Sequence, residues 1–185
     1  MERSRTPADD RVEQFYASDE KPSWRVSAEY LRREQVLVNF STHAAVIDHA
    51  VGLGGDDMGP SPGEMLLAAL SACTAVYLGR AVVQRGIPAT SVTVRARFRA
   101  AHEPGTEVLP RISFLDRIEK RVEVAGELTE QQLAELRYIS EHCAIGETLR
   151  RGVDVHEELV NVDEADATAC RIGSDGSSSC CAAPA

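Results

Sequence analysis

The stretch Met65-Leu-Leu-Ala-Ala-Leu-Ser-Ala-Cys-Thr-Ala-Val-Tyr-Leu-Gly-Arg-Ala-Val-Val83 is the longest apolar segment of the chain and decides its fold. Five of its residues are alanine, and it also carries hydroxyl groups and Arg80, whereas a membrane-spanning helix is richer in Leu, Ile and Phe. Ser61-Pro62-Gly63-Glu64 before it has the form of a helix start, and Gly86 marks an end. We therefore predict a buried central helix and no membrane span.

This predicted helix is apolar on nearly every side, so each of its faces needs a covering surface. One chain of 185 residues with few other helices offers too little of that surface. A second subunit would supply it, and we therefore expect a homodimer.

The residues before the helix are typical of strands. Arg25–Tyr30 and Gln35–Phe40 alternate or run apolar on either side of a charged turn at Arg32-Arg33-Glu34. A third strand is predicted over Ala44–Val51, and residues 52–63 are rich enough in Gly and Pro to form a loop.

After the helix, two further alternating segments predict strands at Ser91–Ala101 and Ile112–Val124. Thr129-Glu-Gln-Gln132 matches the capping box and opens a second helix, whose apolar stripe ends at Cys143. Gly146 is expected to weaken or break that helix.

Strands and helices in this order predict an α+β fold. Residues 1–23 are polar and are expected to form a flexible arm, and residues 24–162 the folded domain, with Val153–Val160 as its last strand. Residues 163–185 are rich in Ala, Ser and Gly and are expected to be a disordered tail that contains cysteines.

The charge and the N-terminal sequence bear on partners and location. The net charge is −9 and no stretch concentrates Lys and Arg on one face, so we expect no nucleic-acid partner. Met1–Asp10 is charged and has no apolar run, which argues against a signal peptide and for a cytoplasmic protein without a membrane partner.

The chain has five cysteines, an odd number that argues against a disulfide scaffold and for reduced thiols. Cys73 and Cys143 lie in apolar periodic segments, where a thiol is commonly a packing residue. No Cys-x-x-Cys or His-x-x-x-His spacing surrounds them, so no metal site is expected there. Cys170, Cys180 and Cys181 could bind a soft metal or exchange disulfides, or they are incidental residues of the tail.

The combination of these features resembles the OsmC/Ohr family. The resemblance covers about Trp24–Val160 and rests on Pro60-Ser-Pro-Gly-Glu-Met-Leu-Leu-Ala-Ala69, Ser71-Ala-Cys-Thr74, Glu141-His-Cys143 and Thr148-Leu149. It implies an intertwined homodimer with two central helices packed between antiparallel sheets. It also implies that Cys73 attacks a hydroperoxide and becomes a sulfenic acid, that Cys143 resolves it as a disulfide, and that an external dithiol resets the protein without a resident cofactor or metal.

This chemistry needs a cation near the attacking thiol. A free thiol has a pKa of about 8.5, and lowering it to about 6 takes roughly 3 kcal/mol at about 1.36 kcal/mol per unit. The helix dipole fades within the first turn, and Cys73 lies about three turns into its helix. In the family an Arg from the N-terminal strands serves, held by a Glu that directly follows the Pro.

This chain departs from that pattern. Gly63 has the place of the Glu, and Glu64 comes one residue later. Arg32, Arg33 and Arg80 are possible donors, and solvated charges are the competing explanation for the first two. We carry over the two cysteines and no arginine.

We therefore predict a thiol-dependent peroxidase that reduces organic hydroperoxides in oxidative-stress defence. A non-catalytic protein of the same fold, which binds an apolar ligand or partner at the dimer interface, is the alternative. A metal or metalloid scavenger that works through the tail is the third.

Overall fold

The computed structural model describes residues 26–40, 42–104, 111–161, 171–172 and 178–179. The chain divides into two compact units. The first unit is Met1–Pro62 together with Glu157–Ala185, and the second unit is Gly63–His156. The predicted arm at residues 1–23 lies outside the described residues, as does most of the predicted tail. Within that tail, β6 (Arg171–Ile172) and β7 (Ser178–Ser179) pair antiparallel.

The first unit contains a three-stranded antiparallel sheet in the order β1-β2-β3, as predicted. Its strands are β1 (Ser27–Arg32), β2 (Gln35–Asn39) and β3 (Ala44–Ile47). The turn between β1 and β2 places Arg33 at a φ of 52°, in the left-handed region. A 3₁₀ turn, η1 (Val51–Leu53), follows β3 within the predicted loop.

A single buried carboxylate organises the loop after β3. Asp48 is fully buried and accepts hydrogen bonds from the backbone amides of His49 (2.7 Å), Asp56 (3.1 Å) and Met58 (3.1 Å). The Gln35 side chain donates a further bond to it from β2. Burial acts to raise the pKa of Asp48, but these hydrogen bonds outweigh it and hold the pKa below its ordinary value.

The second unit consists of a long hairpin and three helices. Helix α2 (Pro62–Arg85) is followed by Gly86 at a φ of 62°, which ends it as expected. The strands β4 (Ala89–Pro104) and β5 (Arg111–Gly126) pair antiparallel, and α3 (Glu130–Glu141) and α4 (Ala144–Arg151) come after them. The predicted capping box is present between Thr129 and Gln132.

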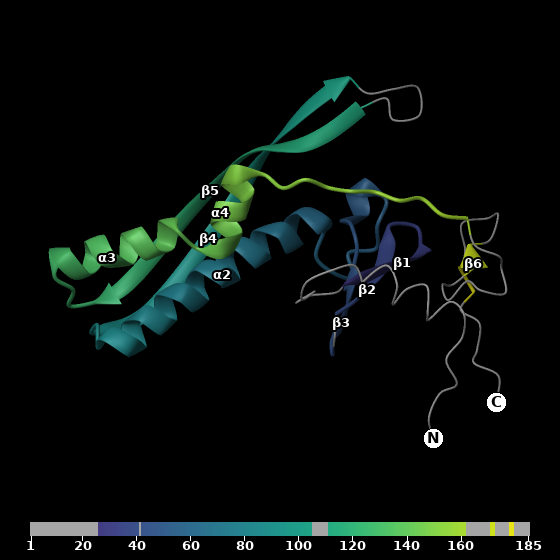
Figure 1. Ribbon diagram of the computed structural model, residues 1–185. Coiled ribbons are helices and arrows are strands. Elements are labelled where there is room, and N and C mark those ends of the chain that lie inside the picture. The colour runs from purple at the N-terminus through teal and green to yellow at the C-terminus, as the bar shows by residue number, and fades with distance from the viewer. Residues whose placement is uncertain (1–25, 41, 105–110, 162–170, 173–177, 180–185) are drawn as a thin grey trace. The chain divides into compact units, whose positions relative to one another are not determined.

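The core of this unit lies between the helices and one face of the hairpin. Leu78 and Ala81 of α2 pack with Leu136 of α3, and Ile87 joins them. Alternate residues of both strands pack against this cluster, namely Val92, Val94, Val122 and Val124. Helices α2 and α3 therefore lie along the same hairpin, as Figure 1 shows.

The opposite face of the hairpin carries a row of exposed arginines. Cross-strand pairing brings Arg95 opposite Arg121, Arg97 opposite Glu119 and Arg99 opposite Arg117. The premise that no segment concentrates basic residues on one face was therefore wrong, because residues two apart on a strand share a face and the partner strand adds its own. Glu119 and Glu123 pair with three of these arginines.

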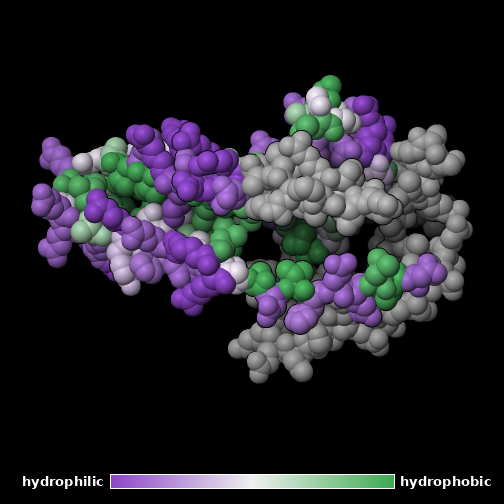
Figure 2. Space-filling view, turned by 90° about the horizontal axis from the view of Figure 1, so that it is seen from above, coloured by the Kyte–Doolittle hydropathy of each residue, from purple (hydrophilic) through white to green (hydrophobic). Residues whose placement is uncertain are grey.

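Helix α2 is only partly covered by its own chain. Its buried residues are Leu70, Thr74, Leu78 and Ala81, whereas Val76 is 49% and Val83 81% exposed. By length and apolar composition alone α2 could cross a membrane. Core helices of soluble proteins pass the same test. Figure 2 shows green hydrophobic residues exposed among the purple hydrophilic ones.

The second helix ends earlier than predicted. The chain breaks at His142-Cys143, and Gly146 lies inside α4 rather than at the break. In a continuous helix the carbonyls of Ser140 and Glu141 would accept from amides four residues on. Here Lys120 donates to the first at 2.5 Å, and Arg150 donates to the second. These two side chains satisfy carbonyls that the end of α3 leaves without an amide partner inside the helix.

The prediction of a last strand at Val153–Val160 was wrong for the single chain. Residues 152–161 form no regular structure and are exposed throughout. Their apolar side chains alternate, but a strand also needs a neighbour that accepts and donates backbone hydrogen bonds. Among the described residues no strand pairs with this segment.

Candidate active site

The two predicted site cysteines come together from distant parts of the second unit. Cys73 lies near the middle of α2 and is half-buried, and Cys143 is fully buried at the break between α3 and α4. A hydrogen bond with the Cys73 side chain is among the interactions that lower the pKa of Cys143, although burial and three other influences act on it more strongly. Cys143 was expected on a helix stripe, but it is the N-cap residue of α4, with extended backbone angles (φ −68°, ψ 146°).

Thr74, directly after Cys73, joins α2 to Cys143. Its Oγ1 atom lies 3.2 Å from Cys143 Sγ, and its hydroxyl donates to the Leu70 carbonyl at 2.9 Å. A hydroxyl has one hydrogen, so it cannot serve the carbonyl and a thiolate together. When Cys143 is protonated, its S–H can donate to the Thr74 oxygen; when Cys143 is ionised, the hydroxyl hydrogen can turn to the sulfur instead.

Lys120 of β5 supplies a positive charge beside this pair. Its Nζ atom donates to Thr74 Oγ1 at 3.2 Å and to the Ser140 carbonyl at 2.5 Å. Burial lowers the pKa of the Lys120 ammonium, while the charges of Cys143, Cys73 and Glu141 act to raise it. Lys120 thus joins β5, α2 and the end of α3 at one point.

The surroundings of Cys143 favour its ionised form. Burial acts to raise the pKa of this thiol, but hydrogen bonding from Thr74 and from the Gly146 amide, together with the Lys120 charge, outweighs burial and lowers the pKa below its ordinary value. The Cys143 side chain makes no regular capping hydrogen bond. Its Sγ atom nevertheless lies 3.0 Å from the position that a Cβ atom would take at Gly146.

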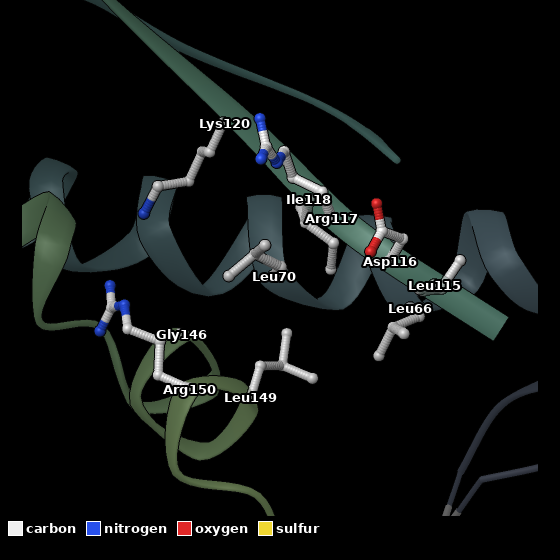
Figure 3. Close-up of a pocket in the computed structure, with 10 residues that line it drawn as sticks. All are labelled: Leu66, Leu70, Leu115, Asp116, Arg117, Ile118, Lys120, Gly146, Leu149 and Arg150. Atoms are coloured by element: carbon white, nitrogen blue, oxygen red, sulfur yellow. The ribbon is translucent and has the colours of Figure 1, made fainter. Parts of the chain in front are cut away.

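A cavity of about 530 Å³ opens beside this cluster. Leu66, Leu70, Ile118 and Leu149 are among its apolar lining residues, and Lys120, Gly146 and Arg150 also line it. Figure 3 shows the charged ends of Lys120 and Arg150 extending toward the same end of the cavity, away from Leu66 and Leu115. Lys120 and Gly146 are therefore shared between the cavity and the surroundings of Cys143.

The arginines considered from the sequence have other partners within the described residues or are exposed. Arg33 forms an ion pair with Asp56 at 2.6 Å, and Arg32 donates to Gln35, both within the first unit. Arg80 is exposed on α2, and Glu64 is exposed in its first turn.

The place of the expected glutamate is occupied by Gly63, which packs against an aromatic ring. A Cβ atom at Gly63 would lie 3.3 Å from the ring atoms of Phe98. A larger side chain there would have to displace that ring.

Sequence reasoning missed Lys120, although the sequence contained a signal for it. In Arg117-Ile-Glu-Lys-Arg-Val-Glu-Val124, the apolar residues alternate with charged ones, and Lys120 stands at an apolar position. The pairing of Lys120 with Ala96 places it on the inner face of the hairpin. A charged residue on such a face needs buried polar partners, and here it has them.

The tail thiols Cys170, Cys180 and Cys181 lie outside the described residues. Within the described part of the chain, no group of three or more His, Cys, Asp or Glu side chains could hold a metal ion.

Comparisons with known proteins agree on the fold. A family model described as OsmC-like protein matches residues 54–158, more than half of the chain. No curated protein matches the chain significantly. Several solved structures are similar over most of their length at low sequence identity, which shows a shared fold.

Three of these structures illustrate the similarity. An OsmC-like protein from Mycoplasma pneumoniae has a TM-score of 0.55 at 16% identity and covers 71% of this chain and 89% of its own. An organic hydroperoxide resistance protein OsmC from Legionella pneumophila has a TM-score of 0.51 at 14% identity, and the match covers 71% of this chain and 92% of that protein. An organic hydroperoxide resistance protein from Elizabethkingia anophelis has a TM-score of 0.52 at 18% identity, and the match covers 71% of this chain and 91% of that protein.

Proposed function

Because this chain belongs to the OsmC-like protein family, we propose that it is a thiol-dependent peroxidase that reduces organic hydroperoxides through Cys73 and Cys143 in oxidative-stress defence. The observation that carries the proposal is the meeting of these two thiols beside one half-buried ammonium group. Two structural neighbours bear the name of organic hydroperoxide resistance proteins, which supports the same activity.

The proposed reaction begins at Cys73, the more exposed of the two thiols. Its thiolate attacks the terminal oxygen of the hydroperoxide, so that an S–O bond forms and the O–O bond breaks. The alkoxide leaves and takes a proton from solvent, and Cys73 becomes a sulfenic acid. An alcohol is the product of this first step.

Cys143 then resolves the sulfenic acid. Its thiolate attacks the Cys73 sulfur, the S–S bond forms, the S–O bond breaks, and hydroxide leaves to become water. An external dithiol reduces this disulfide by exchange and is itself oxidised, so the cycle needs neither a metal nor a resident cofactor.

The proposal includes a cytoplasmic homodimer. Several apolar side chains of α2 are exposed to solvent in the single chain, which is unfavourable for so apolar a helix. Their exposure supports a dimer in which a second copy of the chain covers them. A membrane or a nucleic acid is not part of the proposed function.

The cavity beside Lys120 supports a second candidate. Its apolar wall and volume of about 530 Å³ lie within the usual range of small-molecule sites. A non-catalytic protein of this fold could bind an apolar ligand there, and the thiols would then be packing residues.

The deciding experiment is one equivalent of cumene hydroperoxide followed by intact-mass and peptide mapping. The wild type should form an intramolecular Cys73–Cys143 disulfide. The Cys143→Ser variant should stop at a Cys73 sulfenic acid that over-oxidises with more peroxide, and Cys73→Ser should not react. A variant with Cys170, Cys180 and Cys181 all replaced by Ser is the matched control and should behave as wild type. Slow, equal oxidation of all five thiols would favour the ligand-binding candidate.

A further inference from the structure

The inner face of the hairpin places one charged residue where its neighbours are apolar. Lys120 lies between Ile118 and Val122 on that face of β5, and both of these are partly buried. Burying an ammonium group costs free energy unless acceptors or an opposite charge offset it.

Two of the three Lys120 donors have partners in the structure, Ser140 O and Thr74 Oγ1. Both acceptors are neutral, so neither compensates the charge. The groups that favour the charged lysine are Cys143, Cys73 and the Glu141 carboxylate, and the interaction with Cys143 is the strongest of the three. The nearby charge of Arg150 acts against the charged form of Lys120, whereas the charge of Lys120 itself favours an anion at the Cys143 sulfur.

The geometry directs the effect of Lys120 to Cys143 through Thr74. A donor bond from Lys120 to the Thr74 oxygen polarises the hydroxyl, which makes its hydrogen a better donor to a thiolate. That hydroxyl oxygen lies 3.2 Å from the Cys143 sulfur. Cys143 is fully buried, so the interaction is little screened by water.

We propose that Lys120 is a positioning residue of the resolving step: acting through Thr74, it holds the Cys143 sulfur as a thiolate that is ready to attack oxidised Cys73. The inference rests on the proposed peroxidase function and assigns the built-in cation of the site to the second thiol rather than the first. In the step itself, the Cys143 thiolate forms the S–S bond, the S–O bond of Cys73 breaks, and hydroxide leaves to be protonated by solvent. Lys120 keeps its proton throughout.

The pH dependence of the step depends on every charged group around the sulfur. From α2, β5, α3 and α4 these are, in that order, Cys73, Lys120, Glu141, and Arg150 with its ion-pair partner Glu147. Only one of them, Lys120, both contacts Thr74 and acts directly on the charge of Cys143. Its replacement should therefore move the Cys143 titration without removing the other groups.

The test compares three variants of the full-length chain. Lys120→Met keeps the length of the side chain and removes its charge, and Lys120→Arg keeps the charge. Arg121→Met is the matched control, because Arg121 is the next residue of the strand and is exposed on the outer face. Each variant is mixed with one equivalent of cumene hydroperoxide at several pH values, and sulfenic acid and disulfide are followed by quenched trapping and mass spectrometry.

Lys120→Met should form the Cys73 sulfenic acid at nearly the wild-type rate. Its disulfide formation at neutral pH should slow by about tenfold for each pKa unit by which the Cys143 titration rises. The deficit should vanish at high pH, where Cys143 ionises without help. Lys120→Arg should restore most of the rate, and Arg121→Met should match the wild type. A merely structural role would slow both steps, leave the pH profile unmoved, or fail to be rescued by Arg, and each of these results would overturn the proposal.

A second measurement separates this inference from the peroxidase function. Ultraviolet thiolate absorbance is titrated in a chain that keeps Cys143 as its single cysteine, with and without Lys120→Met. A rise in the Cys143 pKa supports the inference even if the wild type proves inert to peroxide, in which case only the proposed function fails. An unchanged titration beside an active wild type would sink the Lys120 proposal alone.

Discussion

The Oγ1 atom of Thr74 lies 3.2 Å from the Sγ atom of Cys143, and the same oxygen accepts a hydrogen bond from Lys120. One hydroxyl thus stands between the only cation that reaches it in the described structure and a buried sulfur. Cys73 precedes Thr74 in the sequence, and Cys143 contacts Thr74 in the folded chain.

Thr74→Val should raise the pKa of Cys143, because Val keeps the shape of the side chain and removes its hydroxyl. The loss of a buried hydrogen-bonding group should cost about 1 kcal/mol of unfolding free energy, with the fold retained. Combined with Lys120→Met, the rise in pKa should be smaller than the sum of the single effects, because both variants interrupt one path. Thiolate titration of the four proteins measures this; strict additivity would show that Lys120 acts without Thr74.

Gly146→Ala should slow disulfide formation and leave the sulfenic acid step unchanged. The added methyl carbon would lie 3.0 Å from the Cys143 sulfur, closer than ordinary contact. Helix propensity favours Ala over Gly by about 1 kcal/mol, so the overall stability should change little. Gly79→Ala is the control, because the same change in α2 meets nothing within 4 Å in this chain. Equal slowing by both changes would contradict a local effect at the sulfur.

Asp48→Asn should destabilise the first unit and lower its thermal unfolding midpoint at neutral pH. Folding depresses the pKa of Asp48 below its ordinary 3.8, so its contribution is present above about pH 4 and is lost as the pH falls through the folded value. The gap between wild type and variant should therefore shrink in acid. Thermal melts across that pH range check this, and a gap that is constant with pH would rule out the carboxylate as its source.

The protein should sediment as a dimer that does not dissociate on dilution. The exposed Val76, Tyr77 and Val83 of α2 need a partner surface, and an interwoven interface should bury more than about 2,000 Å² in total. Analytical ultracentrifugation at falling concentration measures the state. A stable, folded monomer at micromolar concentration would refute the expectation.

Truncation after Glu164 should leave folding and peroxidase turnover intact, because residues of this composition bury too little apolar area to offset the entropy of ordering them. Turnover assays and melts of the truncated and full-length chains test this. A folded but inactive truncation would bring Cys170, Cys180 and Cys181 into the mechanism.

The helices and strands that local signals determine could be predicted from the sequence. The boundaries of α2 follow from the Ser-Pro start and from Gly86, and the start of α3 follows from the Thr129 capping box. The end of α3 could not be predicted in this way. The carbonyls of Ser140 and Glu141 at that end are satisfied by Lys120 and Arg150, and Lys120 is 20 residues away from Ser140 in the sequence.

The candidate site was predictable only in part. The resemblance pointed to Cys73 and Cys143. It also pointed to an arginine from the N-terminal strands as the cation, and therefore gave no indication of Lys120 on β5. The sequence does mark Lys120, because a Lys stands there at a position where the alternation predicts an apolar residue. Only the strand register, which pairs Lys120 with Ala96, shows that this position is on the inner face of the hairpin. The arginine row on the other face needed the same register.

The joint at His142-Cys143 has a mechanical consequence. The two carbonyls beside it are held by the ends of long, rotatable side chains, whereas an unbroken helix would hold them with its own amides. A movement of Cys143 relative to α2 would therefore not require a turn of α3 or α4 to unwind. In the proposed peroxidase cycle, this joint would give Cys143 room to move as its bond to Cys73 forms and breaks.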